Sequence, residues 1–88
     1  MTHPDPDRLC IVDVKAPLAG FRLKVYRRAD GRHEGLLYGP AGTPVYISVL
    51  YPTAETIITG AIEYLRHALR QPEAATVLAA NARAELKQ

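Results

Sequence analysis

The clearest pattern of hydrophobic and polar positions lies in the middle of the chain, where two-residue alternation gives way to helical spacing. Every second residue over 45–51 is β-branched or aromatic: Val45, Ile47, Val49 and Tyr51. This composition favours a half-buried strand. Pro52 cannot donate to a sheet and ends the strand. The sequence therefore predicts a strand over residues 45–51.

A helix is predicted directly after this strand. Thr53 can accept hydrogen bonds from the first helical N–H groups, and Glu55 lies in the first turn, where the helix dipole favours an anion. Apolar residues then recur at helical spacing: Ile58, Ala61, Ile62, Leu65 and Leu69. Gly60 interrupts the helix at a cost of roughly 1 kcal/mol relative to alanine, which indicates close packing of the helix against the sheet. We expect the helix to run to Arg70.

Three further strands are predicted before this unit. Residues 9–14 form a short apolar run, and residues 21–27 alternate, with Phe21, Leu23 and Val25 on one face. Asp30-Gly31 is a strong hairpin signal, so residues 34–39 return beside that strand. Residues 39–44, rich in glycine and proline, predict a second turn. If the helix covers the face of Phe21, the sequence places Val45, Ile47 and Val49 beneath it.

A second helix is predicted over residues 72–86, with Pro72 at its first position. It is rich in alanine, so we expect it to pack lightly or against a partner. The element order favours an α+β fold: a three- to four-stranded antiparallel meander followed by two helices, the first packed on one sheet face. We expect a disordered tail over residues 1–8 and a single domain over residues 9–88.

Composition narrows the class of protein. The chain has 88 residues, of which 48% are apolar and 23% charged, as in globular proteins. Its apolar runs fall far short of the roughly 20 residues that a membrane span needs. The first residues lack the basic-then-apolar order of a signal peptide. Cys10 is the only cysteine, and we expect a buried thiol in a reducing, cytoplasmic setting.

Charge is unevenly distributed along the chain. The net charge is only +2, yet residues 15–33 hold six basic side chains against one acid, Asp30. One sheet face is predicted to present basic residues beside tyrosines, as RNA-binding and single-strand-binding sheets do. The candidate binding residues are Arg22, Lys24, Tyr26, Arg27, Arg28, Arg32 and Tyr46. The competing interpretation is a solvated or dimerising face, because the net charge is low for a nucleic-acid-binding domain.

No pattern typical of catalysis is visible. His3, His33 and His67 lack the spacing of a metal site, and Ser48 lacks the context of a nucleophile. The glycines are too scattered for a phosphate loop, and paired carboxylates are absent. We therefore expect no enzyme activity, cofactor or metal. A ligand pocket between sheet and helix, lined by Tyr38 and Tyr64, is a further and weaker hypothesis.

The pattern from Phe21 to about Leu69 resembles the YegP-like family of small bacterial proteins. The residues that carry the resemblance are Val25-Tyr26, Asp30-Gly31, Leu36-Leu37, Gly42, Ser48, Leu50-Tyr51-Pro52-Thr53, Gly60 and Ile62. The chain departs from the family at the second turn, and Gly60 and Ile62 are separated by one extra residue. In that family the repeats are tandem or single copies paired as dimers, so one copy implies a homodimer.

The family has no established activity to carry over. The sequence thus predicts a bacterial, homodimeric, non-enzymatic interaction or accessory module. A nucleic-acid-binding module that uses the basic sheet face and hairpin is the alternative.

Overall fold

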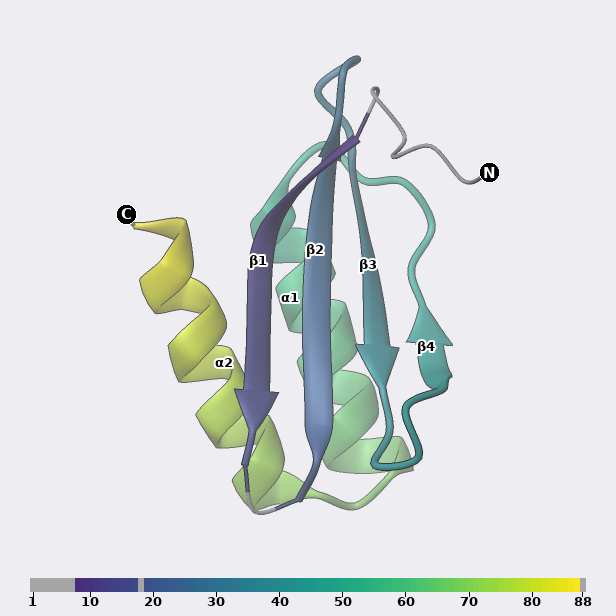
Figure 1. Ribbon diagram of the computed structural model, residues 1–88, viewed down its shortest axis with the longest axis vertical. Coiled ribbons are helices and arrows are strands. Elements are labelled where there is room, and N and C mark those ends of the chain that lie inside the picture. The colour runs from purple at the N-terminus through teal and green to yellow at the C-terminus, as the bar shows by residue number, and fades with distance from the viewer. Residues whose placement is uncertain (1–7, 18, 88) are drawn as a thin grey trace.

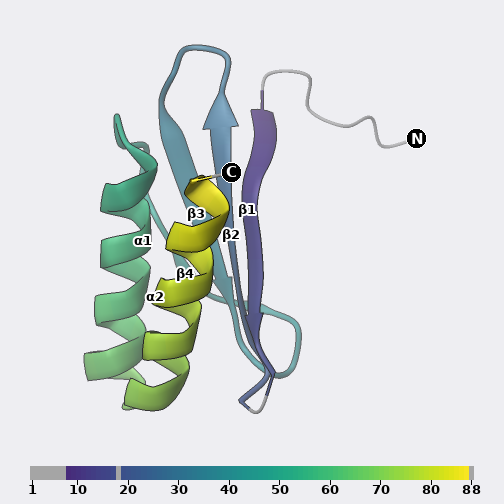
Figure 2. The same ribbon diagram turned by 90° about the vertical axis from the view of Figure 1, so that its left-hand side faces the viewer.

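The computed structural model describes residues 8–17 and 19–87, and it consists of one sheet layer and one helix layer (Figures 1 and 2). The four strands are antiparallel in the order β1-β2-β3-β4, so each pairs with its neighbour in the chain. Their bounds are β1 (Arg8–Ala16), β2 (Phe21–Arg28), β3 (His33–Tyr38) and β4 (Pro44–Ile47). The predicted α+β class is confirmed. The tail predicted over residues 1–8 lies outside the described residues except for Arg8, which begins β1.

Two hairpin turns of the same kind join β2 to β3 and β3 to β4. Gly31 N–H donates to the Arg28 carbonyl at 3.0 Å, and Gly42 N–H donates to the Gly39 carbonyl at 2.9 Å. Both glycines have a φ of +87°, a left-handed conformation that closes this kind of hairpin loop. Asp30 supports the first turn by accepting from the Arg32 N–H at 2.9 Å. The turn signals in the sequence are therefore confirmed at both positions.

The helix layer contains α1 (Ala54–Glu63), its π-helical continuation η1 (Tyr64–Ala68), and α2 (Pro72–Leu86). Thr53 caps α1 as predicted, and its hydroxyl accepts from the Thr56 N–H at 3.3 Å. The prediction of an α-helix as far as Arg70 is wrong in its last turns. The Leu69 N–H donates to the Tyr64 carbonyl at 3.1 Å, five residues back, and Arg70 leaves the helix with a φ of +55°.

The core lies between the sheet and both helices. The helix α1 lies over β2 and β3, whereas α2 lies over β1 (Figure 1). The buried apolar side chains are Val12, Val14, Ala16, Phe21, Leu23, Val25, Leu37, Ile57, Ile58, Ala61, Ile62, Leu65, Ala74, Ala75, Leu78, Ala79 and Ala82. The closest approach is at Gly35, where a Cβ would collide with the Cγ2 of Ile57. Gly60, which the sequence had indicated, also lies close to the sheet: a Cβ there would be 2.8 Å from the hydroxyl of Tyr46 in β4.

The alanine-rich helix α2 is covered by its own sheet. Small buried side chains along it allow a close approach to β1. Two polar contacts fix its C-terminal half, from Arg83 to Glu55 at 2.8 Å and from the Asp13 N–H to the Glu85 carboxylate at 3.1 Å. The second contact occupies a backbone donor on the outer edge of β1. The helix therefore needs no partner to bury its apolar stripe.

The strand β4 ends at Ile47 rather than at Tyr51 as predicted, and only an isolated bridge pairs Tyr51 with His33. Its side chains alternate as predicted, but the two faces are reversed. Tyr46 pairs with buried Leu37 and stacks on Tyr64, with ring centroids 5.1 Å apart. Ser48 is buried, and its Oγ accepts from the Gly35 N–H at 2.7 Å. The apolar residues expected in the core point outwards instead: Val45, Ile47 and Val49 are 37%, 69% and 68% exposed. Hydroxyl-bearing side chains thus occupy the helix side of this strand.

Candidate functional site

The sheet surface opposite the helices, here called the open face, is organised in rows of cross-strand partners. Because directly opposite residues share a face, the strand registers assign its members. The first row is Lys15, Arg22 and Tyr38; the second is Asp13, Lys24, Leu36 and Ile47; the third is Cys10, Tyr26 and Glu34; the fourth is Arg8 and Arg28. A bulge in β1 between Cys10 and Val12 aligns the last two rows. The open face therefore carries most of the predicted binding residues.

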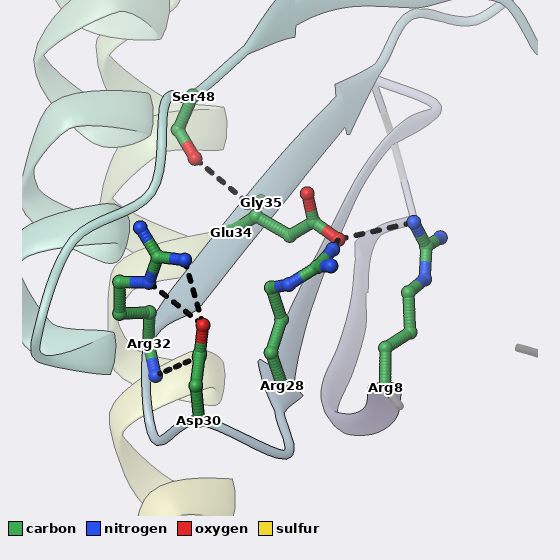
Figure 3. A network of polar contacts seen from close by, with 7 residues as sticks. All are labelled: Arg8, Arg28, Asp30, Arg32, Glu34, Gly35 and Ser48. Carbon is green, nitrogen blue, oxygen red and sulfur yellow. Dashed lines mark hydrogen bonds and ion pairs between the residues drawn. The ribbon is translucent and has the colours of Figure 1, made fainter. Parts of the chain in front are cut away.

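Ion pairing occupies the hairpin end of the open face. The Glu34 carboxylate lies 3.1 Å from Arg8 and 3.6 Å from Arg28 (Figure 3). The Arg8 guanidinium also lies over the Tyr26 ring, 3.8 Å from its centroid. A stacked guanidinium covers one face of that ring. Tyr26 and Arg28 thus reach the open face as predicted, but both are engaged within the sheet.

Arg32 belongs to the turn rather than to a binding surface. Its guanidinium donates twice to the Asp30 carboxylate, at 2.7 and 2.9 Å (Figure 3). These hydrogen bonds from Arg32 lower the pKa of Asp30. Arg27 lies on the other side of β2 from Tyr26 and Arg28, because successive side chains in a strand alternate. The structure does not bring these two arginines into the predicted surface.

The other end of the open face contains a depression of about 320 Å³, here called the basic hollow. It is lined by Lys15, Gly20, Arg22, Lys24, Tyr38, Gly39, Pro40 and Gly42. Arg22 makes a bidentate pair with Asp13 at 2.6 and 2.7 Å, and this pair lowers the pKa of Asp13. The Lys24 ammonium lies 5.7 Å from the centroid of the Tyr38 ring. The basic hollow therefore combines several basic side chains with one aromatic ring.

Sequence reasoning identified Arg22 and Lys24 but missed Lys15 and Tyr38. Lys15 pairs with Arg22 in the sheet register, and Arg22 pairs with Tyr38. The signal was the pairing of residues across three strands, which depends on the length of the two turns that join them. The hydrophobic pattern of each single strand does not show which residues of neighbouring strands pair.

Tyr46 was predicted to lie on the binding surface, but it is absent from the open face. It faces the helices, where burial raises the pKa of its hydroxyl. The hypothetical pocket between Tyr38 and Tyr64 is also wrong, because Tyr38 lies on the open face and Tyr64 packs against Tyr46 beside the helices. An exposed strip, here called the β4 edge, consists of Val45, Ile47 and Val49. It lies at the margin of the sheet, beyond both helices (Figure 1).

Cys10 is exposed, which corrects the expectation of a buried thiol. Its Sγ donates to the Val12 carbonyl at 3.3 Å, across the bulge of β1. Partial burial, followed by the nearby Asp13 carboxylate, raises the pKa of the Cys10 thiol. Because the thiolate is the nucleophile, this setting disfavours a reactive cysteine.

The described residues form neither a metal-binding cluster nor a membrane-spanning helix. No three His, Cys, Asp or Glu side chains among residues 8–17 and 19–87 gather as a metal site would require. None of the helices formed by these residues has the length and apolar character needed to cross a membrane.

Comparison with known proteins adds no relative. No family model, no curated protein and no solved structure matches this chain. The candidate surfaces are therefore argued from their geometry alone, and the resemblance to the YegP-like family stays a prediction.

Proposed function

We propose that this chain is a non-enzymatic interaction module that forms a homodimer by pairing the β4 edges of two copies. The observation that supports it is the outward orientation of Val45, Ile47 and Val49 at the β4 margin, on the side that faces away from the helices. Contiguous exposed apolar side chains at a sheet margin are typical of interaction surfaces.

The backbone of β4 favours strand addition. Ser48 N–H donates inwards to the Gly35 carbonyl at 3.0 Å, so alternation directs the N–H and C=O of Ile47 away from β3. At the opposite margin, α2 lies over β1, and Glu85 occupies the Asp13 N–H. The β4 margin is thus the one that can accept another strand.

The charge pattern favours a second copy as the partner. No charged side chain occurs from Gly35 to Ala54. Proteins commonly protect edge strands with charges, above all lysine. A two-fold axis would bring the same uncharged strand against itself in antiparallel orientation, and such a contact is self-complementary. Two copies would then share one continuous sheet without like-charge repulsion.

The size of this contact predicts a weak dimer. β4 has only four residues, extended by the exposed Val49, so the buried area falls below the roughly 1,200 Å² of standard stable interfaces. We expect a dissociation constant in the micromolar range.

Sedimentation velocity across about 1–200 µM protein spans this range and tests the proposal. The expected result is a concentration-dependent shift from the 9.7 kDa monomer to twice that mass. Ile47→Arg should keep the protein monomeric throughout, because two copies would place like charges face to face at the symmetry axis. The side chain is 69% exposed, so the monomer should remain folded.

Val77→Arg is the matched control, since Val77 is an exposed valine on α2, away from β4. It should leave the mass distribution unchanged. A wild type that stays monomeric at all concentrations would overturn the proposal. Equal loss of dimer in both variants would instead assign the interface to another surface.

The resemblance to the YegP-like family supports the same assembly, because its single copies pair as dimers. We propose a bacterial origin on the same basis, and a cytoplasmic location because the sequence has only one cysteine. The single, poorly nucleophilic Cys10 is compatible with that reducing setting.

A further inference from the structure

We propose that the basic hollow binds the phosphate group of a small phosphorylated ligand. This site lies on the open face and is separate from the β4 edge that carries the proposed dimer. Its basis is a cluster of three cations, Lys15, Arg22 and Lys24, of which only Arg22 is paired with an acid.

The sheet register forces two cations together. Lys15 and Arg22 are direct partners across β1 and β2, and Lys24 follows Arg22 on the same face. Like charges directly opposite each other in a sheet are destabilising. Asp13 offsets the charge of Arg22 but makes no ion pair with either lysine, so a bound anion would stabilise Lys15 and Lys24.

Pairing with acids leaves the hollow positive. Asp13 engages Arg22 through two short hydrogen bonds. Within residues 8–17 and 19–87, neither Lys15 nor Lys24 lies within ion-pair distance of a carboxylate. Two positive charges therefore remain beside a neutralised arginine. Arg8, Arg28 and Arg32 at the hairpin end differ, because each of these three has a carboxylate partner there.

The hollow is shaped by two loops that meet beside the lysines. A Cβ on Gly20 would lie only 3.2 Å from the Cβ of Pro40, so the β1–β2 turn and the β3–β4 turn are in contact. Tyr38, beside this contact, supplies an aromatic wall. A volume of about 320 Å³ lies at the lower end of the roughly 300–1,000 Å³ of small-molecule sites. The ligand class that fits is a phosphate ester no larger than a mononucleotide.

Titration of the isotopically labelled protein with pyrophosphate and adenosine monophosphate at low salt, followed by NMR, tests the proposal. The amide shifts should cluster at Lys15, Gly20, Tyr38, Gly39 and Gly42. We expect affinities of about 1 mM or tighter from a few charged contacts. Lys15→Gln and Lys24→Gln should each weaken binding by about tenfold.

Lys87→Gln is the control, because it removes the same charge from an exposed position after α2. It should leave the affinity unchanged. Asp13→Asn should tighten binding, because Arg22 would then be released towards the ligand. Loss of fold alone could not produce that gain.

Three outcomes would overturn the proposal. The first is an absence of shifts with both ligands. The second is equal weakening by Lys87→Gln and Lys24→Gln, which would reduce the effect to general charge attraction. The third is binding of a single-stranded oligonucleotide, weakened by Lys24→Gln, without binding of the small phosphates; the hollow would then belong to a nucleic-acid surface.

Discussion

At the scale of single residues, two small residues, Gly35 and Ser48, determine how the sheet packs against α1. Gly35 leaves room for Ile57, and its N–H donates to Ser48 at 2.7 Å. The sequence offered no sign of the first contact, because Gly35 reads only as a weak point in a strand and Ile57 lies beside the predicted apolar stripe. The contact joins residues that lie far apart in the chain.

Gly35→Ala is expected to destabilise the fold by about 1–3 kcal/mol, the usual cost of overpacking a tight core. The added Cβ would collide with the Cγ2 of Ile57. Chemical denaturation should report the loss as a lower midpoint. Combined with Ile57→Ala, the glycine substitution should cost at least about 1 kcal/mol less than it does alone, because neighbouring sites couple.

Ile58→Ala provides the control for this pair. Ile58 is as buried as Ile57, but it does not meet Gly35. Gly35→Ala should therefore cost the same with or without Ile58→Ala. Coupling of equal size to both isoleucines would contradict the assignment of the clash to Ile57.

At the scale of elements, the hydrophobic pattern predicted each strand but assigned β4 to the wrong faces. Alternation defines a period without defining which side is inward. The usual preference places valine and isoleucine inside, but here the Ser48 hydroxyl accepts from the Gly35 N–H and the Tyr46 ring packs on Tyr64. An exposed apolar edge that pairs with a second copy would restore the usual preference in the assembled protein.

The end of the first helix is the other place where sequence and structure differ. The widened turn of η1 ends at Arg70, whose φ of +55° is costly for a residue with a side chain. Arg70→Gly should raise the free energy of unfolding by about 0.5–1 kcal/mol, because glycine adopts this conformation freely. Thermal unfolding should show the gain as a higher Tm.

Arg70→Ala separates the backbone effect from the loss of the arginine side chain. Alanine retains the strain of the left-handed conformation, so this variant should not gain stability. An equal rise in Tm for both substitutions would show that removal of the arginine, rather than relief of the backbone, stabilises the protein.

At the scale of the whole molecule, element order was predictable from the sequence and the functional surface was not. Strands, turns and caps depend on neighbouring residues, so residues 8–47 could be assigned as a meander from local signals. The open face depends on how four strands align. That alignment brought Lys15 to Arg22 and paired Asp13 with Arg22, whereas alternation within each strand placed Arg27 and Tyr46 on the other face. Charge counted along the chain therefore overstated the basic surface.

The cross-strand pairs also predict how stability responds to acid. Arg22 lowers the pKa of Asp13, and Arg32 lowers that of Asp30. The unfolded chain binds protons at higher pH than these folded carboxylates do, near pH 4 for an ordinary aspartate. The stabilisation is complete above that pH and is lost as pH falls through the lower folded-state values. Unfolding free energy should thus decrease between about pH 5 and pH 3.

Asp13→Asn isolates the contribution of one pair. Both partners are more than a third exposed, so solvent screening keeps the contribution of the pair to stability small. The variant should reduce the decline on acidification, whereas Glu73→Gln, at an exposed acid with no ion pair in the described chain, should not. Identical acid profiles for all three proteins would exclude the Asp13–Arg22 pair as a source of stability. Because the same substitution should tighten phosphate binding, the pair would then serve to restrain Arg22 at the margin of the basic hollow.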